Sequence, residues 1–137
     1  MQGFIADIED LTTANVDFRR VLYTGKHLQL VLMSLRPGEE IGAEIHATHD
    51  QFFRIEAGSG QVEIDGVSTP VKDDDVVIVP AGARHNVTNT GEHLLKLYTL
   101  YGPPEHRDGL VHPGKPERES EADHFDGKTT ELQSTRT

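Results

Sequence analysis

The sequence predicts an all-β domain, a sandwich or barrel made of short strands. Apolar residues alternate with polar ones over short runs, turn residues separate these runs at regular spacing, and no segment from 18 to 101 combines helical periodicity with helix caps. The chain has 137 residues, which suits one domain, and 35% of them are hydrophobic. We therefore expect a single compact β-core.

Turn signals separate the expected strands. Gly25-Lys26 lies between the first two runs, and Asp65-Gly66 lies between two alternating segments, a strong hairpin signal. Pro70 removes a backbone donor and so predicts an edge strand or a bulge. The expected strands span residues 18–24, 27–35, 41–46, 51–57, 61–65, 67–72, 76–79, 85–90 and 93–101.

Two of the expected strands are identified from their apolar residues alone. The run VVIV, residues 76–79, is entirely apolar and predicts a buried strand. Residues 92–101 alternate as a strand does, although propensity alone leaves a helix open there. We expect an apolar lining for the barrel from Phe53, Ile55, Ile78, Val87 and Leu97.

The chain divides by composition into three parts. We expect an N-terminal arm over 1–17, a barrel over 18–102, and a C-terminal extension over 103–137 that is polar and partly flexible. The arm is expected to pack on the barrel or on a partner subunit. Leu110 and Val111 give the start of the extension enough apolar surface to dock, and we expect flexibility from about residue 119.

Charge and composition disfavour several classes of function. Asp and Glu number 23 and Lys and Arg 13, which gives a formal net charge of −10. This balance disfavours nucleic acid and anionic membranes as partners. There is no cysteine, no apolar run long enough to cross a bilayer, and no N-terminal pattern of a secretory signal. We therefore expect a soluble, cytoplasmic protein.

A first spaced motif lies in the middle of the chain. Gly38 is followed after five residues by Glu44-Ile45-His46, after four more by Gln51, and after six more by Gly58.

A second motif follows it. Asp74 precedes Pro80-Ala81-Gly82 by five residues, His85 follows after two, and Asn89 after three more. The two motifs together resemble those of small single-domain cupins, the RmlC-like jelly-roll proteins that include mannose-6-phosphate isomerase-like cupins. The resemblance implies a double-stranded β-helix, extends over about 18–101, and places metal ligands at Glu44, His46, Gln51 and His85.

The chain departs from the family pattern at the ligands. Position 44 has Glu where the family has His, and position 51 has Gln where the family has Glu. Compared with the family pattern, the carboxylate has moved from position 51 to position 44, but the four expected ligands still carry one negative charge. Residues i and i+2 of a strand face the same side, so Glu44 and His46 can point to one centre. These residues predict one divalent transition metal, Zn, Mn, Fe or Ni, between which nitrogen and oxygen ligands do not discriminate.

The sequence leaves the function open among several hypotheses. A metal-dependent isomerase- or lyase-type enzyme on a small organic or sugar-like substrate would use Glu44 or His49 as the catalytic base. The alternatives are a non-haem metal dioxygenase, a non-catalytic module that binds a small ligand, and a structural barrel. A metal-free pocket lined by the same residues is also open. We expect a small-molecule ligand and a homodimer that covers the edge strands.

Overall fold

Two antiparallel sheets form the fold. The computed structural model describes residues 1–131, and within them ten strands follow one short helix, α1 (Ile8–Ala14). The strands are β1 (Arg19–Thr24), β2 (Gln29–Leu35), β3 (Glu44–Ile45), β4 (Asp50–Ala57), β5 (Ser59–Ile64), β6 (Val67–Lys72), β7 (Val76–Val79), β8 (Arg84–Thr88), β9 (Leu95–Gly102) and β10 (Val111–His112).

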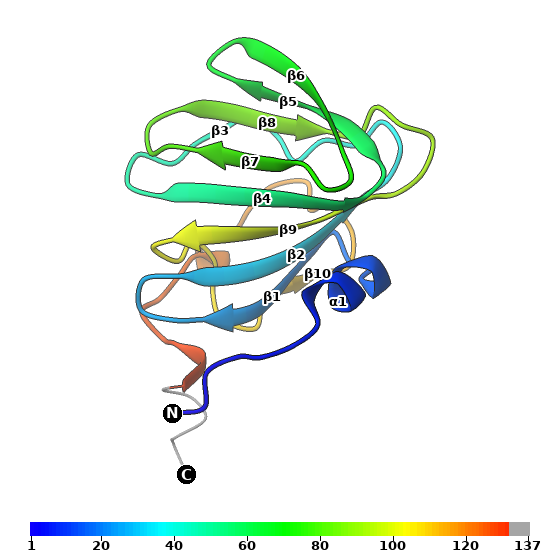
Figure 1. Cartoon of the computed structure of the whole chain (residues 1–137). Helices are drawn as coiled ribbons and strands as arrows, with labels where there is room; N and C mark the ends of the chain where they lie inside the picture. Colours follow the sequence, from blue (N-terminus) through cyan, green and yellow to red (C-terminus); the bar gives the residue numbers. More distant parts are fainter. Residues whose placement is uncertain (132–137) are drawn as a thin grey trace.

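The sheets pack against each other around one core (Figure 1). The larger sheet has the strand order β10-β1-β2-β9-β4-β7, and the smaller has the order β3-β8-β5-β6. Val31 and Ile55 of the larger sheet and Val62 and Val87 of the smaller belong to the same buried cluster. The predicted all-β fold is confirmed, and the two sheets are consistent with a double-stranded β-helix. Most of the segment 93–101 is a strand, β9, which begins at Leu95, and none of it is a helix.

The hairpin between β5 and β6 follows the local turn chemistry. Asp65 and Gly66 both have positive φ, 46° and 84°, as a tight two-residue turn between twisted strands requires. Pro70 lies on β6, which is an edge strand of the smaller sheet. Both turn-based predictions are therefore confirmed, because they depend only on residues that are close in sequence.

The prediction of a buried strand at 76–79 was wrong. β7 is the edge strand of the larger sheet, and Val76 and Ile78 are 50% and 66% exposed, whereas Val79 is buried. Ile78 therefore points away from the core and does not belong to the apolar lining; Phe53, Ile55, Val87 and Leu97 are all buried. The strand predicted over 41–46 is also shorter, since β3 contains two residues.

The segments outside the barrel pack on its larger sheet. Helix α1 begins after Asp7, whose side chain accepts a hydrogen bond from the Asp10 amide, and it contacts β9 and β4. In the extension, β10 pairs with β1, and the hydroxyl of Thr130 accepts a hydrogen bond of 2.8 Å from the amide of Thr24. Thr130 thus links the extension to β1, while the flexibility expected from about residue 119 stays a prediction; residues 132–137 lie outside the described residues.

Candidate metal centre

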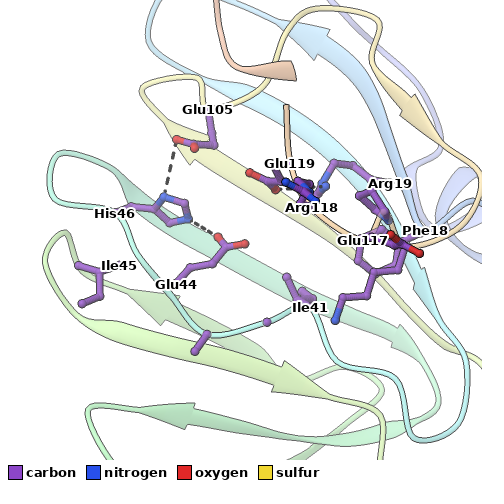
Figure 2. Close-up of a pocket in the computed structure, with 14 residues that line it drawn as sticks. Phe18, Arg19, Ile41, Glu44, Ile45, His46, Glu105, Glu117, Arg118 and Glu119 are labelled. Carbon is purple, nitrogen blue, oxygen red and sulfur yellow. Dashed lines mark ion pairs between the residues drawn. The ribbon is translucent and has the colours of Figure 1, made fainter. Parts of the chain in front are cut away.

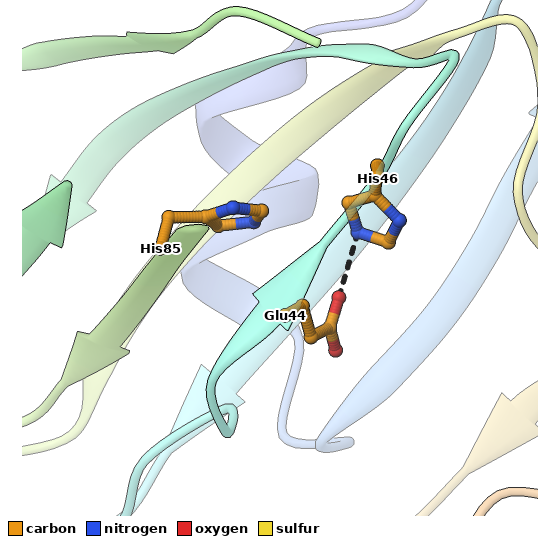
Figure 3. A group of neighbouring side chains, drawn as sticks. All are labelled: Glu44, His46 and His85. Carbon is orange, nitrogen blue, oxygen red and sulfur yellow. Dashed lines mark ion pairs between the residues drawn. The ribbon is translucent and has the colours of Figure 1, made fainter. Parts of the chain in front are cut away.

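Three predicted ligands meet because of the register of two short strands. β3 pairs with β8 so that Glu44 lies directly opposite His85. Residues opposite each other in an antiparallel pair point to the same face. His46 is two residues after Glu44 and shares that face. Figure 3 shows the three side chains converging from the two strands.

The distances suit a metal ion. Ligand atoms of Glu44, His46 and His85 all lie within 4.8 Å of one another. His46 Nε2 is 2.7 Å from Glu44 Oε2, close to the separation of about 3.0 Å between two ligands that stand at right angles around an ion with bonds of about 2.1 Å. These three residues form a histidine–carboxylate cluster that can hold a metal ion.

Two ring nitrogens support this assignment. His46 Nε2 is buried, and the Glu44 carboxylate lies 2.7 Å from it, so both ligand atoms face the same point of the cluster. His85 Nδ1 is 3.2 Å from the carbonyl of Ala83, which can only accept, so Nδ1 carries the proton and Nε2 has the free lone pair that a metal needs. The donor set therefore fits a divalent ion.

Gln51 reaches the cluster from the other sheet. Its side chain on β4 donates to the hydroxyl of Thr99 at 3.0 Å, and its Oε1 lies 3.0 Å from His85 Nε2. With the proton of His85 on Nδ1, two lone pairs would face each other at this distance. A metal ion bound to both atoms would remove that repulsion. The structure thus brings Gln51 together with the other three predicted ligands.

The local charges put Glu44 and His85 in the forms that bind metal, whereas they favour the protonated form of His46, which must lose a proton to bind an ion. Burial raises the pKa of Glu44, but His46 and Arg19 outweigh it and hold the pKa below its usual value. Burial lowers the pKa of His85. Burial also disfavours the charged form of His46, yet Glu44 and Glu105 raise its pKa above the usual value. Near neutral pH, Glu44 is therefore ionised and His85 is neutral, which are the forms that bind metal.

Aromatic rings enclose the two histidines. The ring of Tyr101 packs edge-on against the ring of His46, with 5.8 Å between the ring centres. The ring centres of Phe53 and His85 are 6.2 Å apart. The Tyr101 hydroxyl is 3.3 Å from His106 Nε2, and burial raises the pKa of Tyr101. Tyr101 is 2% exposed, so it forms a wall behind the cluster.

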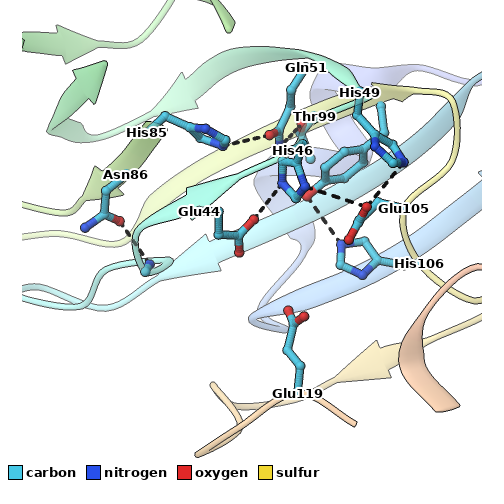
Figure 4. A network of polar contacts seen from close by, with 12 residues as sticks. Glu44, His46, His49, Gln51, His85, Asn86, Thr99, Glu105, His106 and Glu119 are labelled. Atoms are coloured by element: carbon cyan, nitrogen blue, oxygen red, sulfur yellow. Dashed lines mark hydrogen bonds and ion pairs between the residues drawn. The ribbon is translucent and has the colours of Figure 1, made fainter. Parts of the chain in front are cut away.

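A second group lies on the far side of His46 (Figure 4). Glu105 Oε2 is 3.6 Å from His46 Nδ1 and 3.3 Å from His49 Nε2. His49 Nε2 also lies 3.0 Å from the carbonyl of Pro104, so this nitrogen carries a proton and is not a free ligand. We therefore read this group as a polar support for His46 and not as a second metal site. His49, which the sequence offered as a catalytic base, belongs to this group.

A pocket opens beside the cluster (Figure 2). It has a volume of about 410 Å³ and is lined by Glu44 and His46 on one side and by Arg19 on another. In the part of the chain that the structure describes, residues 115–119 and Glu105 complete its wall, whereas His49 does not line it. The cluster is therefore accessible to a small molecule.

Three further residues line this pocket although no sequence motif marks them: Arg19, Glu105 and Glu119. Arg19 is two residues before Val21 on β1, so both side chains point to the same, inward face of the strand. This alternation could have identified Arg19 as an inward-facing cation from the sequence. Glu105 and Glu119 lie in the irregular extension, where no periodicity indicates direction.

The fold and the cluster define a class of protein: a small double-sheet β-barrel with a histidine–carboxylate group that can hold a metal ion. The chain belongs to the cupin family, since residues 31–101 match the family described as "Cupin domain". Within residues 1–131, no helix is long and apolar enough to cross a membrane.

Similar proteins cover most of the chain. YrkC of Bacillus subtilis, described as uncharacterized, is 48% identical over 118 residues, which are 82% of this chain and 63% of that protein. L612 of Acanthamoeba polyphaga mimivirus, also described as uncharacterized, is 36% identical over 121 residues, 85% of this chain and 75% of that protein. The crystal structure of BH2720 from Bacillus halodurans is 48% identical, has a TM-score of 0.82, and aligns over 83% of this chain and 91% of that chain.

Proposed function

We propose that this cupin is a metal-dependent enzyme of the isomerase or lyase type that acts on a small organic molecule. One divalent transition metal, Zn, Mn, Fe or Ni, would be held by Glu44, His46 and His85, with Gln51 as a fourth ligand. The observation that carries the proposal is the convergence of these groups beside a pocket of about 410 Å³. A bound ion would polarise an oxygen atom of the ligand.

The residues of the chain supply binding and proton transfer in this proposal. Glu105 lines the pocket and contacts His49 Nε2 at 3.3 Å. In this arrangement Glu105 Oε2 would accept a proton from a ligand, and the Nε2–H group of His49 would hold the carboxylate in place. His49 therefore acts behind Glu105 and does not contact the ligand itself. The homodimer and the cytoplasmic location stay predictions.

A second candidate is a non-haem iron dioxygenase. Two histidines and one carboxylate, here His46, His85 and Glu44, have the composition of the facial triad that holds iron in such enzymes. With Gln51 weakly bound, the ion would keep open positions for a ligand and for oxygen. The two candidates differ in their need for oxygen.

Turnover of a metabolite panel under air and under nitrogen tests both candidates. The protein is purified without a histidine tag, its metal content is measured, and it is reloaded with each of the four ions in turn. Equal turnover in both atmospheres supports the isomerase or lyase, and turnover under air alone supports the dioxygenase. A protein that binds no metal at neutral pH, or that binds metal and small ligands without turnover, contradicts both enzymes.

The Glu105→Gln substitution is expected to weaken metal binding about tenfold, at the low end of the effect of carboxylates that orient a metal-bound histidine, because the distance to His46 Nδ1 is long at 3.6 Å. The measurement is competition with a fluorescent chelator. Glu117→Gln, which removes the same charge from an exposed position of the same pocket, is the control. Equal affinities for the two variants would show that Glu105 does not position His46.

A further inference from the structure

We propose that Arg19 makes this pocket a site for a small carboxylate, which takes the place now occupied by the side chain of Glu119. The inference rests on the proposed function, because it names the class of ligand that would meet the metal cluster. The structure points to it through a buried cation whose hydrogen-bonding capacity is largely unused.

Arg19 is buried without full pairing. It is 2% exposed, and its guanidinium lies 5.2 Å from the ring centre of Phe18. Nη1 is 3.2 Å from His112 Nδ1 and 3.5 Å from Glu119 Oε1, while Nε is buried with no hydrogen bond within the described residues. A guanidinium has five donors, and a buried charge is costly unless it is paired and hydrogen-bonded.

The two neighbours do not neutralise this cation well. Arg19 can only donate, so His112 Nδ1 accepts, and the ring nitrogen that carries its proton, Nε2, faces Asp123 Oδ2 at 3.3 Å. A neutral imidazole supplies no counter-charge. Glu119 supplies one, but its side chain is 37% exposed and the contact is long for an ion pair. A better-placed anion would therefore compete with Glu119 for Arg19.

The charge of the whole pocket makes this choice depend on the metal. Four carboxylates and three cationic side chains line it, which leaves one negative charge, and a divalent ion would change the sum to +1. A low-dielectric pocket concentrates such a field. The metal-loaded pocket therefore attracts an anion, and the metal-free pocket does so less.

The shape of the pocket defines the ligand further. The lining runs from Glu44 and His46 to Arg19 and Glu119 (Figure 2), and its volume of about 410 Å³ admits a small metabolite. A carboxylate on Arg19 and a second oxygen donor directed at the cluster would occupy both ends. The ligand class is therefore a small organic acid with two oxygen functions, such as a dicarboxylate or a hydroxy acid.

The alternative is a purely structural Arg19, which fixes the extension to β1 through Glu119 and His112. Succinate binding to wild type and to variants of Arg19 and Glu119 distinguishes the two roles, and the neutral diamide succinamide measures how much of the affinity depends on charge. Calorimetric titration of Zn²⁺-loaded wild type is expected to give binding of succinate at least about tenfold tighter than that of succinamide, because a charge-assisted bidentate pair is lost in the amide.

Three variants complete the test. Arg19→Gln is expected to weaken succinate binding about tenfold or more, whereas Arg20→Gln, its exposed neighbour on the opposite face of β1, should change it less than about threefold. Glu119→Gln removes the competing carboxylate and is expected to tighten succinate binding. A structural role predicts lower stability of Arg19→Gln with unchanged succinate affinity.

Each outcome decides the inference. Equal succinate affinity in folded Arg19→Gln and wild type overturns it, and if the samples contain metal the proposed function survives that result. If Arg19→Gln does not fold by circular dichroism, Glu119→Gln decides: tighter binding supports the inference, and unchanged or weaker binding overturns it. If wild type binds no metal, the proposed function fails, and the same comparison on metal-free protein still decides whether Arg19 binds the anion.

Discussion

His46→Ala is expected to abolish metal binding at micromolar protein concentration. His46 Nε2 is buried and lies 2.7 Å from the Glu44 carboxylate, at the centre of the cluster. Losing one imidazole of four ligands costs on the order of 3 kcal/mol, or about 100-fold in affinity. His85→Ala should give the same loss. Gln51→Ala should have a smaller effect, because a neutral amide is the weakest ligand of the set.

Elemental analysis and chelator competition measure this effect. His93→Ala removes an exposed histidine and is the control, with metal content equal to wild type. The thermal unfolding of each metal-free variant is compared with that of metal-free wild type, so that a folding defect is not taken for a lost ligand. Retention of one equivalent of metal by folded His46→Ala would show that the ion binds elsewhere.

Gly58→Ala is expected to cause the largest loss of stability among single substitutions in the turns. Gly58 has a φ of +90°, and an added Cβ would lie 2.6 Å from the carbonyl oxygen of Leu94 and 3.1 Å from the Leu95 Cα. Both are backbone atoms beside β9, so no side chain can rotate away. Strain and overpacking together should lower the free energy of unfolding by roughly 2–4 kcal/mol.

Urea denaturation followed by circular dichroism measures this loss. Gly109→Ala is the matched control, since Gly109 also has a positive φ, +76°, but its added Cβ would meet no atom within 4 Å. It should cost only the backbone strain, about 1 kcal/mol. Equal unfolding midpoints for the two variants would contradict the role of the close approach to Leu94.

The two edge strands show how far sequence patterns extend. Pro70 placed β6 at an edge correctly, because a missing donor excludes a central position whatever the neighbours are. The apolar run of β7 gave no such restriction, and that strand lies at an edge of the larger sheet with Ile78 exposed. Hydrophobicity measures what a strand can bury and does not fix how many neighbours it has.

The sequence by itself determined the β-architecture, and its resemblance to cupins pointed to the residues of the candidate metal cluster. Alternation and turn chemistry act between near neighbours, and the spacing of Glu44 and His46 puts both on one face of one strand. Only the tertiary structure decided which groups surround that cluster. Arg19 enters from the first strand, and Glu105 and Glu119 come from an irregular extension whose side chains have no period. Their positions follow from packing between distant segments, which local pattern does not encode.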